Sequence, residues 1–220
     1  MNSPFLSNTA LFRDVTEEEI ERMLICLAPR EKEFRKGEVI FHAGSVIHEV
    51  GMVESGCVNI VVNFYWGDSQ IFGHITEGMI FGENYAAVPD RELIPDVVAA
   101  APSKILLFDI NRLLNTCRLS CACHHKVIQN LLRISAENSL NLSARMLHTA
   151  SRSLRGRLLS YLSEQAQLNG SEHFTIPFDR QQLANYLSVD RSAMSNELSK
   201  MRKDGLIVYR KNEFTLKEKR

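Results

Sequence analysis

Short apolar runs separated by glycines fill the first half of the chain. Eight of the eleven glycines lie between Phe34 and Leu107, and the runs between them include residues 38–41, 58–62 and 105–108. Regularly spaced turns between short β-rich runs are typical of antiparallel all-β structures. We therefore expect an antiparallel barrel or jelly roll (a double-stranded β-helix) in this part of the chain.

A helix is predicted before the roll. Thr16 is followed three residues later by Glu19, which is the capping-box pattern of a helix start. Val15 and Ile20 are spaced as a hydrophobic staple. The helix should run to about Leu27.

The chain becomes helical again near Ile110, and its longest predicted helix covers residues 123–148. One apolar row on this helix, Val127, Leu131 and Ile134, could cover the roll. A second row has the alternating four- and three-residue spacing of a coiled-coil seam and consists of Ile128, Leu132, Ser135, Ser139, Leu142 and Met146. A helix that is apolar on two sides has to bury both. We expect the second row to pair with the same helix of a second subunit; burial within one chain is the alternative.

A helix-turn-helix is predicted near the C-terminus. Asp179 with Gln182 forms a capping box for one helix, and Asp190 caps the next after a tight turn at Ser188-Val189. A small residue, Ala184, stands where the two helices would cross. After Gly205, the apolar runs 206–209 and 214–216 predict a hairpin wing.

The second of these helices would present a polar surface. Its first turns carry Arg191, Ser192, Ser195 and Asn196, at the place where such helices meet base edges. Arginine can grip guanine and asparagine adenine through two hydrogen bonds each. We predict that these four contact DNA, together with Arg180, Gln181, Lys200 and Lys211. The alternative is a plain helical hairpin with a solvated polar face.

The charge distribution favours DNA binding. The chain is neutral overall, but residues 1–150 hold 13 basic and 18 acidic side chains, whereas residues 151–220 hold 13 and 8. A basic C-terminal third on an acidic larger part is what a DNA-binding module on a regulatory domain would show.

The bulk sequence also bears on location and redox state. The N-terminus lacks the basic and apolar stretches of a signal peptide, and no apolar run reaches membrane-spanning length. We expect a cytoplasmic protein with no membrane partner. The odd number of cysteines, five, predicts reduced thiols rather than a disulfide framework.

The chain resembles the Crp/Fnr family of bacterial transcription regulators over nearly its whole length. The resemblance is carried by residues 34–44, 78–83, the long helix and 179–207. It implies an α+β protein with an effector-sensing, cyclic-nucleotide-binding-like jelly roll over 1–122, a dimerisation helix and hinge over 123–150, and a winged helix-turn-helix over 151–220. It further implies a homodimer that binds pseudo-palindromic double-stranded DNA and works with RNA polymerase. Neither the target genes nor the choice between activator and repressor follows from it.

The effector site departs from the cyclic-AMP-binding pattern of that family. Gly82-Glu83 is present, but Pro95 and Asp96 occupy the positions of the phosphate-binding Arg-Ser pair. Neither residue can neutralise a phosphate, so cyclic AMP is not the expected effector; Arg91 is the available substitute. The expected pocket residues are Gly82, Glu83, Asn84, Tyr85, Arg91 and Asp96.

The cysteines and histidines bear on other cofactors. The cysteine group that holds an iron–sulfur cluster in oxygen-sensing members is missing, since only Cys26 lies near the N-terminus. Five soft ligands do gather in nine residues, namely Cys117, Cys121, Cys123, His124 and His125. They could bind zinc, copper or haem iron or act as a redox switch. Packing at the base of the long helix is the alternative.

Two other classes of function compete with a DNA-binding regulator. Jelly-roll oxygenases need a His-x-His pair, and none occurs, so we do not expect an enzyme. A sensor that signals through a protein partner would present an apolar contact surface, whereas the face around Arg191 is polar. The expected function is sequence-specific DNA binding controlled by an unidentified small-molecule or redox effector.

Overall fold

The structure is a computed structural model that describes residues 3–115 and 122–217. The chain forms two compact units, Met1–Glu137 and Asn138–Arg220, which divide within one long helix. No helix in the described residues is both long and apolar enough to cross a membrane.

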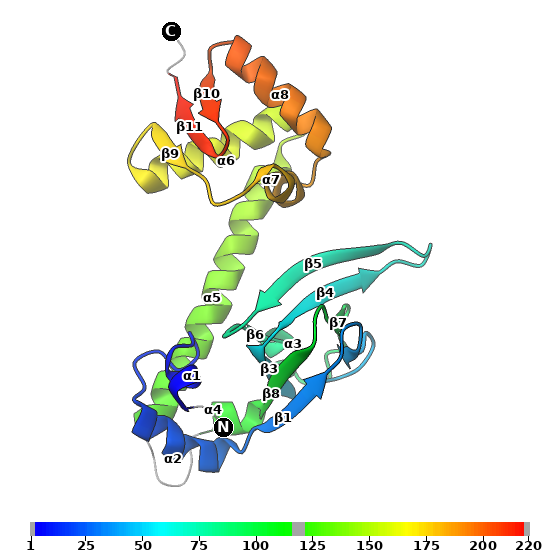
Figure 1. Cartoon of the computed structure of the whole chain (residues 1–220), viewed down its shortest axis with the longest axis vertical. Coiled ribbons are helices and arrows are strands. Elements are labelled where there is room, and N and C mark those ends of the chain that lie inside the picture. The colour runs from blue at the N-terminus through cyan, green and yellow to red at the C-terminus, as the bar shows by residue number, and fades with distance from the viewer. Residues whose placement is uncertain (1–2, 116–121, 218–220) are drawn as a thin grey trace. The chain divides into compact units, whose positions relative to one another are not determined.

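The first unit contains two four-stranded antiparallel sheets (Figure 1). One has the order β1-β8-β3-β6, formed by Arg30–Phe34, Ser103–Asp109, Glu49–Ser55 and Ile80–Phe81. The other has the order β2-β7-β4-β5, formed by Val39–Phe41, Asp96–Ala99, Cys57–Asn63 and Ser69–Thr76. This confirms the predicted antiparallel roll, which begins slightly earlier than expected.

A single apolar core lies between the sheets and extends to the helices of the unit. Phe41 and Phe81 meet in it with ring centroids 5.7 Å apart. Gly51 is needed there because a Cβ at its position would lie 2.1 Å from the Phe81 ring. The turn glycines predicted from the sequence thus include one whose role is close packing.

Short helices flank the roll: α1 (Ser3–Ser7), α2 (Glu17–Leu27), α3 (Glu83–Ala86) and α4 (Ile110–Leu114). The capping box at the start of α2 is confirmed. The Thr16 hydroxyl accepts from the Glu19 amide at 3.2 Å, and the Glu19 carboxylate accepts from the Thr16 amide at 3.0 Å. Val15 and Ile20 are both buried.

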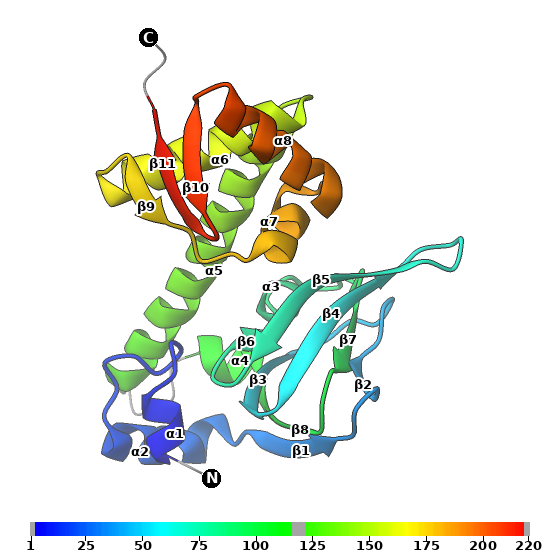
Figure 2. The same cartoon turned by 45° about the horizontal axis from the view of Figure 1, so that its top comes forward.

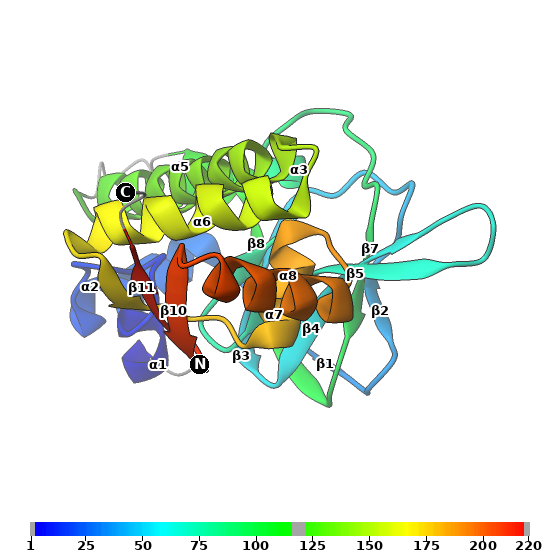
Figure 3. The same ribbon diagram turned by 90° about the horizontal axis from the view of Figure 1, so that it is seen from above.

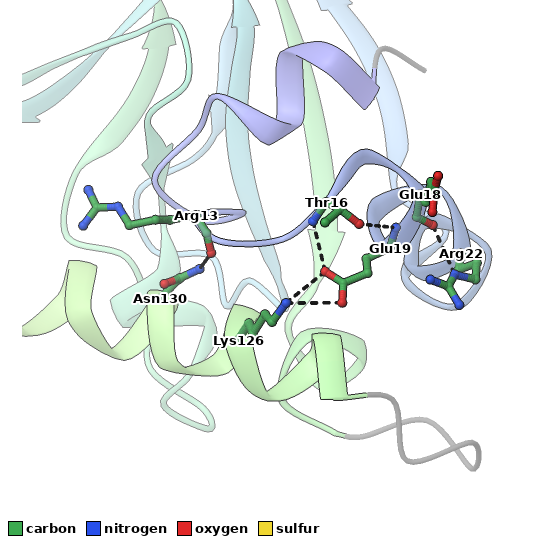
Figure 4. A network of polar contacts seen from close by, with 7 residues as sticks. All are labelled: Arg13, Thr16, Glu18, Glu19, Arg22, Lys126 and Asn130. Atoms are coloured by element: carbon green, nitrogen blue, oxygen red, sulfur yellow. Dashed lines mark hydrogen bonds and ion pairs between the residues drawn. The ribbon is translucent and has the colours of Figure 1, made fainter.

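The long helix α5 (Ala122–Ala150) slightly exceeds the predicted span of 123–148. Its first apolar row packs on the roll as expected: Val127 and Leu131 are buried, and Ile134 is partly buried against the same core. Polar contacts reinforce this packing (Figure 4). Asn130 donates to the carbonyl oxygens of Leu11 and Arg13 at 3.1 and 2.8 Å, and the Lys126 ammonium lies 3.0 Å from the Glu19 carboxylate.

The second unit contains the C-terminal part of α5, three further helices and a small sheet (Figure 2). The helices are α6 (Leu154–Asn169), α7 (Arg180–Leu187) and α8 (Arg191–Lys203). The sheet has the order β10-β11-β9, formed by Ile207–Arg210, Glu213–Leu216 and His173–Thr175. The predicted hairpin wing is confirmed as β10 and β11, whereas β9 was not predicted.

Candidate nucleic-acid interface and effector site

Two consecutive capped helices form the predicted helix-turn-helix. Asp179 and Gln182 make a reciprocal capping box on α7, and the Asp190 carboxylate accepts from the Ala193 amide at 2.7 Å to cap α8. Ser188 ends α7 in the left-handed conformation, with φ of 54°. This leaves only Val189 and Asp190 between the left-handed residue and the first residue of α8.

The buried side of α8 fixes its orientation in the second unit. Met194, Leu198 and Met201 are fully buried in the core with α6 and α7. Arg155 of α6 adds two ion pairs, at 2.5 Å to Glu197 and 2.7 Å to Asp204. Figure 3 shows α8 and the wing strands together on one side of α6.

The opposite side of α8 is polar and open to solvent. Arg191, Ser192 and Asn196 are exposed, and none of their side chains makes a hydrogen bond or ion pair within the described residues. Ser195 is half-buried and donates to the carbonyl oxygen of Arg191 at 2.9 Å. Lys200 is exposed and lies 3.9 Å from Glu197. Most of the predicted reading face is therefore free to take up an external partner.

The wing turn is held in an uncommon conformation. Lys211, which connects β10 to β11, has φ of 53°, a left-handed backbone that favours glycine. The Arg180 guanidinium donates to the Lys211 carbonyl oxygen at 2.7 Å and lies over the rings of Tyr209 and Phe214 at 5.0 and 5.3 Å. Burial lowers the pKa of Arg180 from its usual value. The Lys211 side chain itself is exposed.

Arg180 and Gln181 thus differ from the free residues of α8. Arg180 is engaged by the wing, a role that the sequence did not reveal, and its contact with DNA stays a prediction. Gln181 is exposed and donates to the Asn185 side chain at 3.0 Å.

Four of the predicted effector residues, Gly82 to Tyr85, lie at the start of α3. Gly82 precedes this helix with φ of 81°, and a Cβ there would lie 3.0 Å from Ile47. Glu83 is buried, and Tyr85 packs partly buried against the core. Asn84 is exposed and accepts a hydrogen bond from Ser135 of α5 at 3.5 Å.

Internal hydrogen bonds occupy the carboxylate of Asp96. Its two oxygens accept from the Ala43 amide at 2.8 Å and from the Asn63 side chain at 2.6 Å. Pro95 beside it is buried, and Arg91 is exposed on the preceding loop. Within the described residues, Arg91 makes no ion pair.

Three cavities of the described structure lie away from these residues. One of about 720 Å³ is bounded by β1, β2 and the segment 42–49, with Arg30, Lys32 and Arg112 among its lining residues. A second of about 720 Å³ is lined by Glu33, Arg35 and Lys104 among others, and a third of about 450 Å³ adjoins the wing. None of the three is lined by a predicted effector residue, so the effector site stays a prediction.

The cysteine and histidine cluster is only partly within the described structure. Cys117 and Cys121 lie outside the described residues. Cys123 is half-buried against the roll core, and His125 is exposed. His124 is buried, its Nδ1 has no hydrogen-bond partner among the residues that the structure describes, and burial lowers the pKa of its ring. Among the described side chains, no three histidine, cysteine or carboxylate groups converge as a metal site.

The second apolar row of α5 is largely exposed. Leu132, Leu142 and Met146 are 69%, 62% and 71% accessible to solvent in the single chain. Ser139 is exposed, and Ile128 and Ser135 are half-buried. The large apolar side chains in the C-terminal part of the row are thus left largely uncovered by the single chain.

The fold and the site together define the class of protein. Residues 31–119 match the cyclic nucleotide-binding domain, and residues 156–220 match the Crp-like helix-turn-helix domain. The chain belongs to the Crp/Fnr family, whose members are DNA-binding transcription regulators with an effector-binding domain rather than enzymes.

Individual relatives are distant. Electron transport regulator A of Shewanella oneidensis is 22% identical over 183 residues, which cover 81% of this chain and 71% of that protein. Catabolite Activator Protein of Thermus thermophilus is 20% identical, with 96% of this chain and 94% of that one covered and a TM-score of 0.51. CprK complexed with OCPA is 13% identical, with coverages of 90% and 91% and a TM-score of 0.64. At these identities the solved structures show a shared fold.

Proposed function

We propose that the protein is a homodimeric regulator that reads a pseudo-palindromic DNA site with α8. The observation that carries this proposal is the contrast between the two sides of that helix. One side is fixed by buried methionine and leucine side chains and by the Arg155 ion pairs, whereas the side chains of Arg191, Ser192 and Asn196 on the other side have no polar partner among the described residues. A rigid helix with free donors and acceptors near its N-terminus suits the major groove.

Each polar residue has a distinct proposed role. Arg191 donates two hydrogen bonds to guanine, and Asn196 pairs with adenine. Lys211 on the wing contacts phosphate, which gives affinity without sequence preference. Ser192, Ser195, Gln181, Lys200 and Arg180 complete the interface.

The proposed dimer interface is the second row of α5. Leaving three large apolar side chains of one helix face in water is unfavourable, and burying a leucine is worth roughly 1.5–3 kcal/mol. Ser135 and Ser139 are small enough to let two helices approach closely. A two-fold dimer would present two copies of α8, which is what a pseudo-palindromic site requires.

The proposed effector is a small molecule or a redox signal acting on the roll, at Gly82, Glu83, Asn84, Tyr85, Arg91 and Asp96 or at the cysteine cluster. Cyclic AMP fits poorly. A phosphate placed beside Asp96 would meet a second negative charge, and the Asp96 oxygens already accept internal hydrogen bonds. CprK in complex with OCPA shows only that a protein of this fold carries a ligand.

One further partner and a location follow from the family. RNA polymerase is the proposed protein partner of the DNA-bound dimer. A regulator acts in the compartment that holds its DNA, so the proposed location is the cytoplasm.

Selection of bound fragments from genomic and random DNA tests this function. The full-length protein should enrich one sequence with two inverted half-sites about one helical turn apart, roughly 10–10.5 base pairs between centres. Sedimentation of the complex should give two chains per site. Enrichment of no sequence above the input, or of a single half-site by one chain, would contradict the proposal.

A further inference from the structure

The C-terminal end of α7 is covered by two arginines from outside the helix-turn-helix. The last carbonyl groups of a helix have no partner within it and carry partial negative charge. In α7 the last carbonyls belong to residues 185–188, which lead directly into the turn before α8; among them, the Asn185 carbonyl also accepts the Ser188 amide at 3.2 Å. The carbonyl of each of these four residues accepts a guanidinium hydrogen bond.

One of the arginines comes from α5. Arg145 donates from Nε to the Tyr186 carbonyl at 2.9 Å and from Nη2 to the Asn185 carbonyl at 3.0 Å. Nη2 also lies 3.4 Å from the Ser188 hydroxyl, and the guanidinium carbon lies 5.8 Å from the Tyr186 ring centre. The planar fork of an arginine suits such simultaneous contacts.

The other arginine comes from α6. Arg157 donates from Nη1 to the carbonyls of Leu187 and Ser188 at 3.1 and 3.2 Å. Its Nε donates to the Ser151 carbonyl at 2.9 Å, in the turn that joins α5 to α6. Arg157 therefore ties the helix-turn-helix to the same turn from which α6 departs.

A buried histidine adds polar contacts between α5 and α6. His148, near the end of α5, is 3% exposed and bonds through its two ring nitrogens to Ser160 at 3.0 Å and Glu164 at 2.9 Å on α6. Its ring meets Tyr161 edge-on at 5.6 Å. The end of α5, the start of α6 and the end of α7 are thus cross-linked by polar contacts.

We propose that Arg145 and Arg157 are positioning residues for DNA reading. They fix the turn before α8 to the C-terminal part of α5. The orientation of Arg191 is therefore set by α5, and the helix-turn-helix does not rotate freely about the turn between α5 and α6. Neither arginine is proposed to contact DNA itself. The inference rests on the proposed function, because it concerns how two α8 helices are held in register with two half-sites.

The distance between half-sites provides a readout that a merely structural role would not change. Adding or removing one base pair moves one half-site along the DNA and rotates it by roughly a tenth of a turn. If the two helix-turn-helix units are held rigidly, the dimer should bind sites of altered spacing more weakly than the selected site. If they can rotate, the dimer should bind both kinds of site with similar affinity. A variant that only unfolds more easily would lose affinity for all spacings alike.

The experiment compares the affinity of full-length protein for the selected site and for sites with one base pair inserted or removed at the centre. For Arg145→Gln we expect weaker binding to the selected site and a loss of spacing preference of about tenfold, within the range of coupling between protein sites. Arg157→Gln should act in the same direction, and Arg145→Lys should retain part of the preference because a lysine can still donate to one carbonyl. Arg152→Gln is the control, since Arg152 is exposed and makes no hydrogen bond within the described residues.

The outcomes separate the two proposals. If wild type and Arg145→Gln discriminate between spacings equally, with both folded by circular dichroism at the binding temperature, the positioning role is wrong. Should Arg145→Gln fail to fold, Arg157→Gln and Arg145→Lys decide the question through the same ratio, the affinity for the selected site divided by the affinity for the sites of altered spacing. If the wild type itself selects no DNA sequence, the proposed function fails, and the positioning role fails with it.

Discussion

The contact between Glu19 and Lys126 links α2 to α5. The Glu19 carboxylate accepts from the Thr16 amide and from the Lys126 ammonium, and these contacts lower its pKa from the usual 4.5. The folded state therefore gains stability from this carboxylate at pH values above the pKa that Glu19 has in the unfolded chain. That gain disappears as the pH falls through the lowered pKa of the folded protein.

Glu19→Gln should make this contribution visible. Glutamine can preserve the capping box but not the ion pair, so we expect a loss of at most about 1 kcal/mol at pH 7, as for other partly exposed pairs. Because protonated glutamate resembles glutamine, the difference should vanish at pH values below the folded pKa of Glu19. Urea unfolding between pH 7 and pH 3 measures it. Glu18→Gln is the control, and an equal pH profile for both variants would contradict the assignment.

Caps were the most predictable residues. Thr16, Asp179 and Asp190 act through groups only three residues away, so the local sequence contains the whole interaction. Arg180 was assigned to DNA from its position alone. Its stacking on Tyr209 and Phe214 depends on where the wing packs, which no local pattern encodes.

At the scale of elements, α5 is the feature that the sequence described best. Its two rows follow helical spacing over many residues, and the row facing the roll is buried as expected. Short elements escaped prediction because they hold too few residues for a period to show. β9, with three residues, exists through its pairing with β11.

Disrupting the second row should separate the subunits. Leu132→Asp combined with Leu142→Asp places two carboxylates in the proposed seam, and each buried leucine contributes roughly 1.5–3 kcal/mol. We expect monomers in sedimentation equilibrium and poor affinity for the selected DNA. Arg133→Asp with Asn141→Asp is the control, since both positions are exposed and lie off the row. A dimer that persists in the leucine variant would place the interface elsewhere.

The whole molecule combines an effector unit with a DNA-reading unit. The sequence allows more to be predicted about the functional residues of the second unit than about those of the first. The proposed DNA-reading face uses helix caps and surface residues that are local in sequence. An effector site is made by side chains from several strands, so its shape depends on the closed roll. The cavity lined by Arg30, Lys32 and Arg112 likewise joins residues far apart in the sequence, so no local pattern predicts it.

Cyclic AMP should not bind the effector unit tightly. A charge in a partly buried site without a partner costs several kcal/mol, and Asp96 would add repulsion to that cost. Titration calorimetry with cyclic AMP should detect no binding at micromolar concentrations. Micromolar binding that is lost in Arg91→Ala would contradict this expectation and identify Arg91 as the phosphate partner.

Base reading by Arg191 is the central claim. A bidentate contact to guanine is worth about 1–3 kcal/mol and specifies one base position. Because a dimer makes the contact twice, Arg191→Ala should weaken binding to the selected site by roughly 30-fold or more. Lys211→Asn should instead weaken binding to every sequence alike and reduce its salt dependence, since asparagine keeps the left-handed turn but removes the charge.

The most direct test measures the affinity of wild type, Arg191→Ala and Lys211→Asn for the selected site and for each of its single-base changes at one salt concentration. We predict that Arg191→Ala loses discrimination at one position in each half-site and keeps the remaining preferences. If Arg191→Ala weakens binding to all of these sequences equally, Arg191 contacts the backbone, and α8 does not read the bases in the way proposed.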